Sequence, residues 1–484
     1  MKLTKLFKQI DFVLTHGDLE VEIEHLAYHS KKVKPQSLFV CINGKRQDGS
    51  QYIDEAVNNG AVAIVSENNG LYYPNTTMIY VKDVRRALAL LSCSFFNFPS
   101  THLNIIGITG TKGKTTVAMM MYDVLKNSGL KVGAIGTNGV FMEGVIYPLE
   151  NTTPESYEIQ YYLDKMVKLG YTHVIIEVTS IGIKRHRVDG IHFDIGCFTN
   201  LSPDHIGENE HHSFEEYKHY KMILMERSNV SFINNDDFYA VDMINASNGK
   251  VRLYDLSRII HENVSDIRYL NKQGLKMSFL YKQKEFIIPL PGKFNVSNAL
   301  LCTGVCEYLG IELSIIKDTL MKIHIEGRSE YVKTYEDIHV YIDYAHNALS
   351  MENILKTMLH YKAKRLITLF GCGGNRDRKR RYEMGKISGT YASLSIITSD
   401  NSRYEATEKI IADIITGMKE TSGEYVVIED RKSAIHFALQ SAQMGDMVLI
   451  LGKGHEAYQE LDGVKKEFIE RTVIEEYVEN KKWQ

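Results

Sequence analysis

Short apolar runs alternate with amphipathic stretches along the whole chain. In the first hundred residues, apolar runs at 37–42, 61–65 and 78–81 are separated by helical patterns such as 52–57 and 85–97. Uninterrupted apolar runs are typical of parallel strands covered on both faces by helices. The alternation of strands and helices therefore predicts an α/β fold.

The pattern divides the chain into three blocks. Strands of the second block are expected at 103–106, 132–135, 173–178, 194–198 and 230–233. Residues 268–290 change to a hairpin rhythm, and strands of the third block are expected at 365–370, 394–398, 425–429 and 447–451. We predict domains at residues 1–99, 100–326 and 327–484, with a linker at Pro99–His102.

A glycine-rich turn, Gly107–Thr116, lies between the first strand of the second block and a predicted helix at 117–125. Such a turn leaves backbone N–H groups free beside the positive end of a helix, which is a site for polyphosphate. Lys114 is placed to reach the phosphates and Thr115 to hold Mg²⁺. The strict pattern would need a glycine at Ile108, so the match is Gly110-x-x-Gly113-Lys114-Thr115.

Polar residues follow two further strands of this block. Glu177 ends one strand and Asp204 and His205 come shortly after the next, so all three are expected at the ligand-binding edge of the sheet. His211, His212 and His219 do not have zinc spacing, and we interpret those not needed by the site as surface groups. Periodicity alone assigns Lys218 and Lys221, on a helix beginning at Phe214, to solvent.

Three turns of the third block also follow strands: Gly371–Asp377, Asp400–Arg403 and Gly452–Glu456. They are expected to bring Arg376, Asn401, Arg403 and Glu456 to one rim. Two guanidinium groups beside a carboxylate suit a ligand that carries carboxylates and an ammonium.

Composition narrows the class of protein. The 484 residues have a formal net charge of −3, which gives no basic field for nucleic acid. The six cysteines lack metal-ligand spacing, and Cys302 and Cys306 are expected to face a core. Few scattered thiols and no apolar run long enough for a signal peptide or membrane span predict a cytoplasmic protein, which we expect to be a monomer.

The chain resembles the Mur ligase family over nearly its whole length. The resemblance rests on strings that occur in the family order: Thr109–Thr115, Asn151–Pro154, Glu177–Ser180 with Arg187-Val188, Phe198–His205, Tyr217-x-x-x-Lys221, Phe294–Asn298, Gly327–Glu330, Asp343–His346, Phe370–Asp377, Asp400–Arg403 and Gly452–Gln459. It implies a central P-loop ATPase domain with a parallel sheet, an α/β N-terminal domain and a Rossmann-like C-terminal domain.

The resemblance also implies a role for particular residues. ATP would be bound by Gly110, Thr111, Gly113, Lys114, Thr115, Thr116, Asn295, Asn298, Arg328 and Asp343. The UDP-N-acetylmuramoyl-L-alanyl-D-glutamate substrate would be bound by Ser30, Asp48, Gly49, Thr152, Thr153, Ser180 and Arg187, and the incoming amino acid by Arg376, Asp400, Asn401, Arg403, Gly452 and Glu456. Mg²⁺ would be held by Thr115, Glu177, His205 and Lys221, the last as a carbamate formed with CO₂. Lys114, Glu177, His205 and Lys221 would be catalytic.

Several positions depart from the family pattern. The usual Asp-Ser-Arg is His29-Ser-Lys31, and the usual His after Ser180 is Ile181. Other departures are Asn375 before Arg376, Ser402 in place of Pro, and Ala348 in place of Pro. The metal and phosphate residues are retained, so these changes bear on selectivity and loop stiffness.

The family chemistry is ATP-dependent amide formation through an acyl phosphate. Arg403 favours a diamino diacid such as meso-diaminopimelate, or an isostere such as lanthionine, over L-lysine. Two other interpretations remain: a folylpolyglutamate- or cyanophycin-type ligase, and a nucleotide-binding scaffold without activity. The N-terminal block and Arg187 weigh against the first, and intact Lys114, Glu177 and Lys221 weigh against the second.

Overall fold

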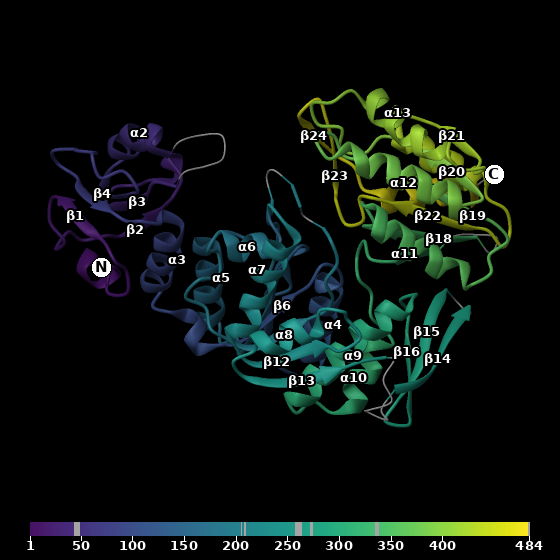
Figure 1. The fold of residues 1–484 in the computed structure, drawn as a ribbon, viewed down its shortest axis with the longest axis horizontal. Helices are drawn as coiled ribbons and strands as arrows, with labels where there is room; N and C mark the ends of the chain where they lie inside the picture. The colour runs from purple at the N-terminus through teal and green to yellow at the C-terminus, as the bar shows by residue number, and fades with distance from the viewer. Residues whose placement is uncertain are drawn as a thin grey trace. The chain divides into compact units, whose positions relative to one another are not determined.

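The computed structural model describes residues 1–42, 49–204, 206–207, 210–256, 264–271, 274–333 and 338–482. Contacts between Cα atoms divide the chain into two compact units. The first contains Met1–Ser257 and Leu300–Glu312, and the second contains Arg258–Ala299 and Leu313–Gln484. Each unit is an arrangement of helices around sheets, as the α/β prediction requires (Figure 1).

A five-stranded sheet forms the first part of unit one, in the order β1-β5-β4-β3-β2. Its strands are β1 (Val13–His16), β2 (His25–Ala27), β3 (Ser37–Val40), β4 (Ala61–Ser66) and β5 (Thr77–Tyr80). The accompanying helices are α1 (Leu3–Leu6), α2 (Ile53–Asn58) and α3 (Val84–Phe95). All neighbours are parallel except β1 and β5. The segment expected as a linker, Pro99–His102, is a 3₁₀ helix.

An eight-stranded sheet forms the rest of unit one, in the order β13-β12-β11-β6-β10-β7-β8-β9. Its strands are β6 (Asn104–Thr109), β7 (Val132–Gly136), β8 (Gly139–Met142), β9 (Val145–Tyr147), β10 (His173–Glu177), β11 (Phe193–Phe198), β12 (Ser228–Asn234) and β13 (Lys250–Tyr254). The helices are α4 (Lys114–Asn127), α5 (Ser156–Lys168), α6 (Ser180–Lys184), α7 (Phe214–Glu226) and α8 (Ala240–Ala246), with the end of α9 (Lys293–Tyr308). The strands from β13 to β7 are parallel, so their carboxyl ends share one edge.

Unit two contains an antiparallel sheet of β14 (Val264–Asn271), β15 (Leu275–Tyr281) and β16 (Lys284–Ile288), which confirms the predicted hairpin. Its larger sheet has the order β17-β18-β22-β19-β20-β21. These strands are β17 (Glu330–Lys333), β18 (His339–Asp343), β19 (Leu366–Phe370), β20 (Leu394–Ile397), β21 (Tyr425–Val427) and β22 (Met447–Leu451). Only β17 runs antiparallel to its neighbour in this sheet.

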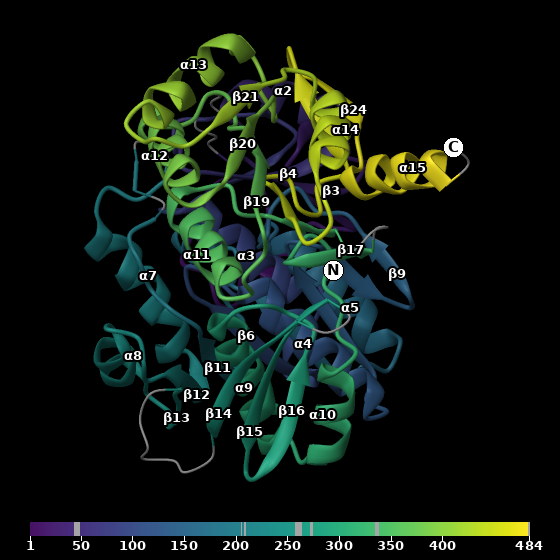
Figure 2. The ribbon, with the colours of Figure 1, turned by 90° about the vertical axis from the view of Figure 1, so that its right-hand side faces the viewer.

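Helices cover both faces of the larger sheet of unit two. Helices α11 (Ala348–Leu359), α12 (Arg378–Tyr391) and α13 (Thr407–Met418) lie on one face, and α14 (Arg431–Ser441) and α15 (Glu470–Lys482) on the other (Figure 2). The unit also contains α10 (Leu313–Leu320) and the hairpin β23 (Tyr458–Leu461) and β24 (Val464–Glu467). Double coverage explains the uninterrupted apolar sequence of β19 and β22, all of whose residues are buried.

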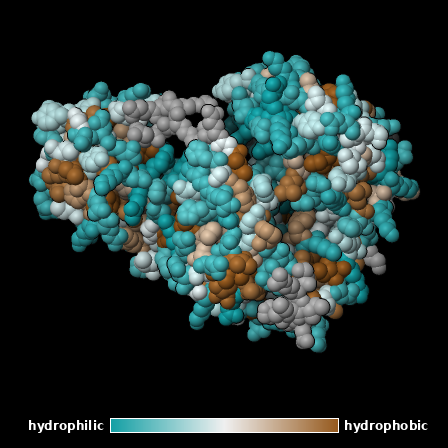
Figure 3. Space-filling model, in the orientation of Figure 1, coloured by the Kyte–Doolittle hydropathy of each residue, from teal (hydrophilic) through white to brown (hydrophobic). Residues whose placement is uncertain are grey.

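The apolar residues of the five-, six- and eight-stranded sheets form separate hydrophobic cores with the helices that cover them. On the face drawn in Figure 3, hydrophilic residues cover most of the surface and apolar side chains gather in small groups. No helix in the described part of the chain is long and apolar enough to cross a membrane.

Candidate active site

The phosphate loop connects β6 to α4, where the sequence predicts it. Gly113 precedes the first residue of α4 and has a φ of 86°, and Gly110 has a φ of 147°. A Cβ on Gly110 would lie 1.9 Å from Oγ1 of Thr199, so the turn has no room for a side chain there. Because β6 lies between β10 and β11, the residues after those two strands are its neighbours at the same edge.

Two lysines meet at one carbonyl of this loop. Nζ of Lys114 and Nζ of Lys221 each donate to the carbonyl oxygen of Gly110 at 2.8 Å, and Lys114 also donates to the carbonyl of Thr111 at 3.3 Å. Lys114 on α4 and Lys221 on α7 therefore share a hydrogen-bond acceptor in this turn. Lys114 places a positive charge where a polyphosphate would be held, and Lys221 lies beside it.

The solvent-exposed position that periodicity assigns to Lys221 is wrong. Its side chain is 1% exposed and its Nζ lies 4.6 Å from the ring centroid of Tyr217. Burial, and then the nearby charge of Lys114, lower the pKa of Lys221 well below its ordinary value. The Lys218 side chain is partly exposed at the surface and forms ion pairs with Glu215 and Asp242. Of these two lysines, Lys221 is the one inside the site, where burial favours its neutral amine.

The carboxylate of Glu177 is buried beside the loop. Its Oε2 accepts from Oγ1 of Thr115 at 2.9 Å and from Oγ1 of Thr137 at 3.1 Å, and its Oε1 accepts from the Thr137 amide at 2.9 Å. A Cβ on Gly136 would lie 2.2 Å from Oε1 of Glu177, so a glycine is needed before Thr137. A carboxylate and hydroxyl oxygens are the ligands that Mg²⁺ prefers, so these residues fit that ion. Thr137 was not found from the sequence.

Three of the residues expected to bind the muramoyl-dipeptide lie around Glu177 and Thr137. Oγ1 of Thr153 donates to the Glu177 carbonyl at 2.8 Å, and Thr152 and Thr137 share a hydroxyl contact of 3.0 Å. Arg187, 5% exposed, donates to the Thr153 carbonyl at 2.8 Å and pairs with Glu155 at 2.7 Å. Thr152, Thr153 and Arg187 are thus brought together with Glu177.

Ser180 is held by a histidine that sequence reasoning missed. Nε2 of His211 lies 2.9 Å from Oγ of Ser180, and the His211 side chain is fully buried against Tyr217 and Tyr220. Interpreting His211 as a surface group is therefore wrong, and no spacing in the sequence signals its burial. His212 and His219 are exposed, as expected.

The remaining residues that the sequence assigns to substrate and metal binding in this unit differ in where they lie. Ser30 is buried at the start of the 3₁₀ helix Ser30–Lys32, beside the five-stranded sheet. Asp204 forms an ion pair of 3.1 Å with Lys112 of the phosphate loop. His205 and Asp48 lie outside the described residues, so the roles expected of them stay predictions.

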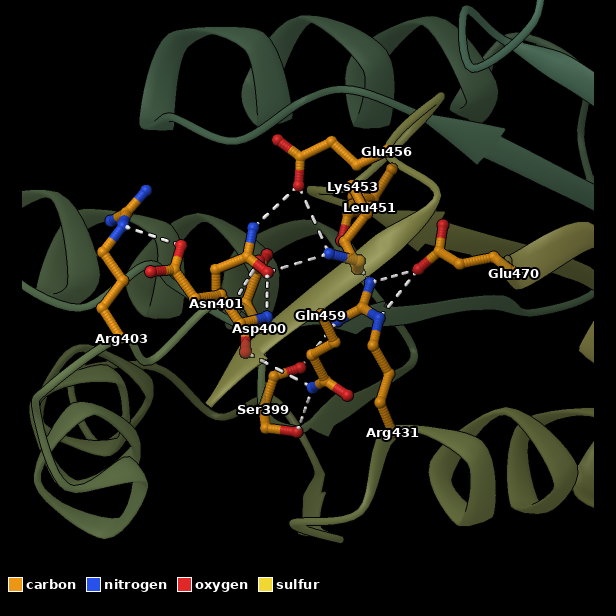
Figure 4. A network of polar contacts seen from close by, with 11 residues as sticks. Ser399, Asp400, Asn401, Arg403, Arg431, Leu451, Lys453, Glu456, Gln459 and Glu470 are labelled. Atoms are coloured by element: carbon orange, nitrogen blue, oxygen red, sulfur yellow. Dashed lines mark hydrogen bonds and ion pairs between the residues drawn. The ribbon is translucent and has the colours of Figure 1, made fainter. Parts of the chain in front are cut away.

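In unit two, the three predicted turns follow β19, β20 and β22 at one edge of the sheet. Nδ2 of Asn401 donates to Oε2 of Glu456 at 2.7 Å, and Nζ of Lys453 donates to both side chains, at 3.1 Å and 3.3 Å (Figure 4). Lys453 is fully buried, and Asp400 is 8% exposed. The structure therefore joins the second turn to the third through a network that contains one lysine not found from the sequence.

Arg376 belongs to the first turn, and Arg403 contacts that turn from the second. Nη1 of Arg403 donates to the carbonyl of Gly374 at 2.6 Å, and its Nε lies 3.8 Å from Glu460. A Cβ on Gly373 would lie 3.2 Å from Nη1 of Arg403 and 3.7 Å from Cγ of Arg376. Arg376 is exposed and Arg403 is partly exposed. Both cations lie at the predicted rim.

Glu405 connects the turn after β19 to the turn after β20, and it was not identified from the sequence. Its carboxylate accepts from the Asn375 amide at 3.0 Å and pairs with Arg381 through two contacts of 2.7 Å. Arg381 is 1% exposed and also pairs with Asp413 at 2.9 Å. The Arg381 hydrogen bonds lower the pKa of Glu405 to about 2. Asn375 has a φ of 53°, a conformation that Asn adopts more readily than most residues.

The remaining residues expected at ATP also lie in unit two. Asn298 donates to Oδ1 of Asn295 at 3.2 Å, and both are buried. Asp343 accepts from the Ser329 amide at 2.7 Å, and burial raises its pKa while the charge of Arg328 opposes the rise. The Arg328 guanidinium lies 4.6 Å from the Tyr344 ring centroid. Arg328 and Asp343 are therefore neighbours within this unit.

Comparisons with known proteins show which family the chain is similar to. Three family models match: "Mur ligase family, catalytic domain" over residues 22–96, "Mur ligase middle domain" over 108–306 and "Mur ligase, glutamate ligase domain" over 327–454. A protein from Caldanaerobacter subterraneus subsp. tengcongensis, named UDP-N-acetylmuramoyl-L-alanyl-D-glutamate--2,6-diaminopimelate ligase, is 40% identical over 98% of both chains. A relative of the same name, numbered 1, from Clostridium acetobutylicum is 39% identical over 99% of both.

A solved structure is also similar over the full length. It is that of a UDP-N-acetylmuramoyl-L-alanyl-D-glutamate--2,6-diaminopimelate ligase, with a TM-score of 0.69 at 28% sequence identity. The alignment covers 100% of this chain and 99% of that one.

Proposed function

The chain belongs to the Mur ligase family, and we propose that it is the ATP-dependent amide ligase that joins a diamino diacid to UDP-N-acetylmuramoyl-L-alanyl-D-glutamate. This reaction would extend a peptidoglycan precursor by its third amino acid. The observation that carries the proposal is the meeting of Lys114 and Lys221 at the Gly110 carbonyl, in the phosphate loop after β6.

The reaction begins with a poor electrophile, the D-glutamyl carboxylate. Transfer of the γ-phosphoryl group of ATP turns this carboxylate into an acyl phosphate, and ADP leaves. The loop amides and Lys114 orient the phosphates in line and offset the negative charge that develops during transfer. The amine of the diacid then attacks the acyl carbon, phosphate leaves, and the amide remains.

Mg²⁺ would be held by Thr115 and Glu177, whose oxygens lie 2.9 Å apart, and by His205. When bound, the ion supplies charge neutralisation and a template for the phosphate oxygens. Thr137 donates to both oxygens of the Glu177 carboxylate and so fixes its orientation, in which it would hold the ion.

Lys221 would act as a carbamate. The nitrogen of a neutral amine can attack CO₂ and lose a proton, which gives an anionic carbamate in place of a cation. The burial that lowers the pKa of Lys221 favours the neutral amine. The product would serve as a further Mg²⁺ ligand and would offset the charge of Lys114.

Substrate recognition is divided among three groups of residues. Thr152, Thr153, Ser180 and Arg187 would hold the muramoyl-dipeptide, and Ser30 with Asp48 and Gly49 the uridine end. Gly110, Thr111, Gly113, Thr116, Asn295, Asn298, Arg328 and Asp343 would contact ATP. Arg376, Asp400, Asn401, Arg403, Gly452 and Glu456 would select the diacid, whose distal carboxylate suits Arg403.

One experiment separates this proposal from its alternatives. We expect ATP hydrolysis by the purified protein to depend on UDP-N-acetylmuramoyl-L-alanyl-D-glutamate and a diamino diacid, with phosphate release and product measured together. Dependence on a folate or on a cyanophycin primer would favour the related ligases. The absence of turnover with every acceptor, despite nucleotide binding, would favour the inactive scaffold.

We further propose that the protein works as a monomer. Its place would be the cytoplasm, where ATP and the UDP-linked substrate are made. Light scattering of the purified protein would test the monomer directly, and a stable dimer would contradict it.

A further inference from the structure

Behind the amino-acid turns lies an ion pair that is almost fully buried, between Arg431 and Glu470. Arg431 is the first residue of α14 and is 0% exposed, and Glu470 is the first residue of α15 and is 2% exposed. Nε and Nη2 of Arg431 both lie 2.7 Å from Oε1 of Glu470. Figure 4 shows the guanidinium between Glu470 and the ends of two strands.

The other contacts of Arg431 are with backbone carbonyls at the ends of those strands. Nη1 donates to the carbonyl of Ser399 at 3.0 Å, and Nη2 donates to the carbonyl of Leu451 at 2.9 Å. Ser399 precedes Asp400, and Leu451 precedes Gly452. One guanidinium therefore fixes the starting points of two turns that carry the amino-acid residues.

The strands that lead into these two turns do not pair with each other. The strands before them, β20 and β22, are separated by β19 in the sheet, so no backbone ladder connects their ends directly. Arg431 spans this separation with a rigid planar fork, which a lysine ammonium cannot reproduce at both carbonyls. Gln459 also contacts the end of β20, because its side-chain amide donates to Oγ of Ser399 at 2.9 Å.

A purely stabilising role explains this pair less well. Removing two charges from water costs about as much as their attraction returns, so a buried ion pair is weak evidence for stability. Burial raises the pKa of Glu470, in keeping with that desolvation cost. The carbonyl contacts of Arg431, in contrast, are specific to the two turns.

We infer that Arg431, oriented by Glu470, is a positioning residue for the amino-acid substrate: it sets the relative position of the Asp400–Arg403 and Gly452–Glu456 turns. The inference rests on the proposed function, because it concerns the same substrate. Arg431 acts through the backbone at Ser399 and Leu451, and the side chains that face the substrate belong to the turns themselves.

The test compares steady-state kinetics of Arg431→Lys with the wild type, varying each of the three substrates in turn. Displacing a turn by about 1 Å can cost on the order of 10²-fold in efficiency, so we expect KM for the diamino diacid to rise about tenfold or more. KM for ATP and for the UDP-linked substrate should not change. An unchanged KM for the diacid would overturn the inference.

A matched control exists at the opposite edge of the same sheet. Asp446, 1% exposed, precedes β22 and accepts from Nε of Arg365 at 3.0 Å, and Arg365 precedes β19. Asp446→Asn removes an equally buried carboxylate charge at the other end of the strands, although its partner Arg365 is 37% exposed. We expect it to lower stability without raising KM for the diacid selectively. An equal selective rise in this variant would overturn the inference.

A double variant covers the case in which Arg431→Lys fails to fold. Arg431→Met with Glu470→Met removes both buried charges, a change that is often neutral for stability. The two carbonyls still lose their donor, so KM for the diacid should stay high in a stable protein. Recovery of the wild-type KM, or an equal rise for all three substrates, would overturn the inference. Absence of turnover in the wild-type protein would instead contradict the proposed function.

Discussion

At the residue level, Lys114 carries the greatest expected effect on the chemical step. Lys114→Ala removes a positive charge beside the transferring phosphoryl group, and the loss of one such stabilising group typically costs about 10²–10³-fold in kcat. Single-turnover measurement of phosphate transfer in the purified variant tests this. Near-normal turnover in a folded variant would contradict the assignment of the phosphate loop.

Lys221 provides a second test, because its proposed carbamate can be detected directly. We expect mass spectrometry under native conditions, or ¹³C NMR with labelled bicarbonate, to detect one carbamate, and Lys221→Ala to abolish it together with activity. The physical reason is the neutral amine that burial favours. Removing bicarbonate should lower the activity of the wild type.

A specific result would exclude the carbamate at Lys221. A Lys221→Ala variant with full activity that bicarbonate does not affect would exclude a carbamate ligand. Lys218→Ala is the matched control, because Lys218 lies on the same helix but pairs with Glu215 and Asp242 at the surface. It should leave the bicarbonate dependence unchanged.

The burial of Lys221 could have been predicted from its register. Tyr217, Lys221 and Leu224 are spaced as i, i+4 and i+7, and all three are buried on one face of α7. A lysine in an apolar stripe is a signal, and treating it as solvated ignored that stripe. His211 gave no comparable signal, because its burial depends on α6 and α7 packing together across a loop.

At the level of elements, the Arg381–Glu405 pair holds the turn after β19 to the turn after β20. The folded pKa of Glu405 is about 2, whereas a free glutamate titrates near about 4.3. The contribution of ionised Glu405 to the free energy of unfolding is therefore complete above about pH 4.3, and it is lost as the pH falls toward 2. The difference in urea midpoint between wild type and Glu405→Gln should be largest near pH 6 and shrink toward pH 3.

That prediction fails if the difference is constant with pH, because the carboxylate charge would then play no part. Lys386 and Glu420 form an ion pair of 2.9 Å in which both side chains are exposed, and neither residue belongs to the two turns. Exposed pairs contribute about 0–1 kcal/mol, so Glu420→Gln should give a smaller difference at every pH.

Most long apolar strands were predicted from the sequence, whereas several strands at sheet edges were not. The apolar runs at 173–178 and 447–451 became β10 and β22 because strands buried on both faces carry few polar residues. The missed strands β13 and β17 lie at sheet edges, and β13 is largely exposed, so its sequence alternates with charges. Such strands are defined by pairing partners distant in the chain.

The candidate site was predicted to the extent that its residues follow strands. Glu177, Asn401 and Glu456 lie at strand ends, where topology brings them to one edge within each unit. The residues that hold them in place, Thr137, Lys453, Glu405 and Arg431, were not found. Their roles depend on contacts between turns, which no local pattern encodes.

For the whole molecule, three activities must be combined: ATP use, recognition of a UDP-linked dipeptide and selection of an amino acid. The family models match in three consecutive segments, at 22–96, 108–306 and 327–454. Our division at residues 99 and 326 stays a prediction. The selection of the amino acid is the part of the proposal that rests most on this chain's own residues.

Arg403 makes that selection testable. A diamino diacid offers a distal carboxylate that L-lysine lacks, and sites that pair such a group reject analogues without it by about 10⁴–10⁵-fold when the pairing is well buried. The Arg403 side chain is 28% exposed, and Ser402 replaces a proline, so the discrimination should be smaller. Arg403→Ala should raise KM for the diacid far more than KM for ATP.

The most direct measurement is kcat/KM of the wild-type protein for meso-diaminopimelate and for L-lysine, with ATP and UDP-N-acetylmuramoyl-L-alanyl-D-glutamate saturating. We predict a preference for the diacid of at least about 10²-fold, because L-lysine has no distal carboxylate for the Arg403 guanidinium to bind. Equal values for the two amino acids would contradict the account.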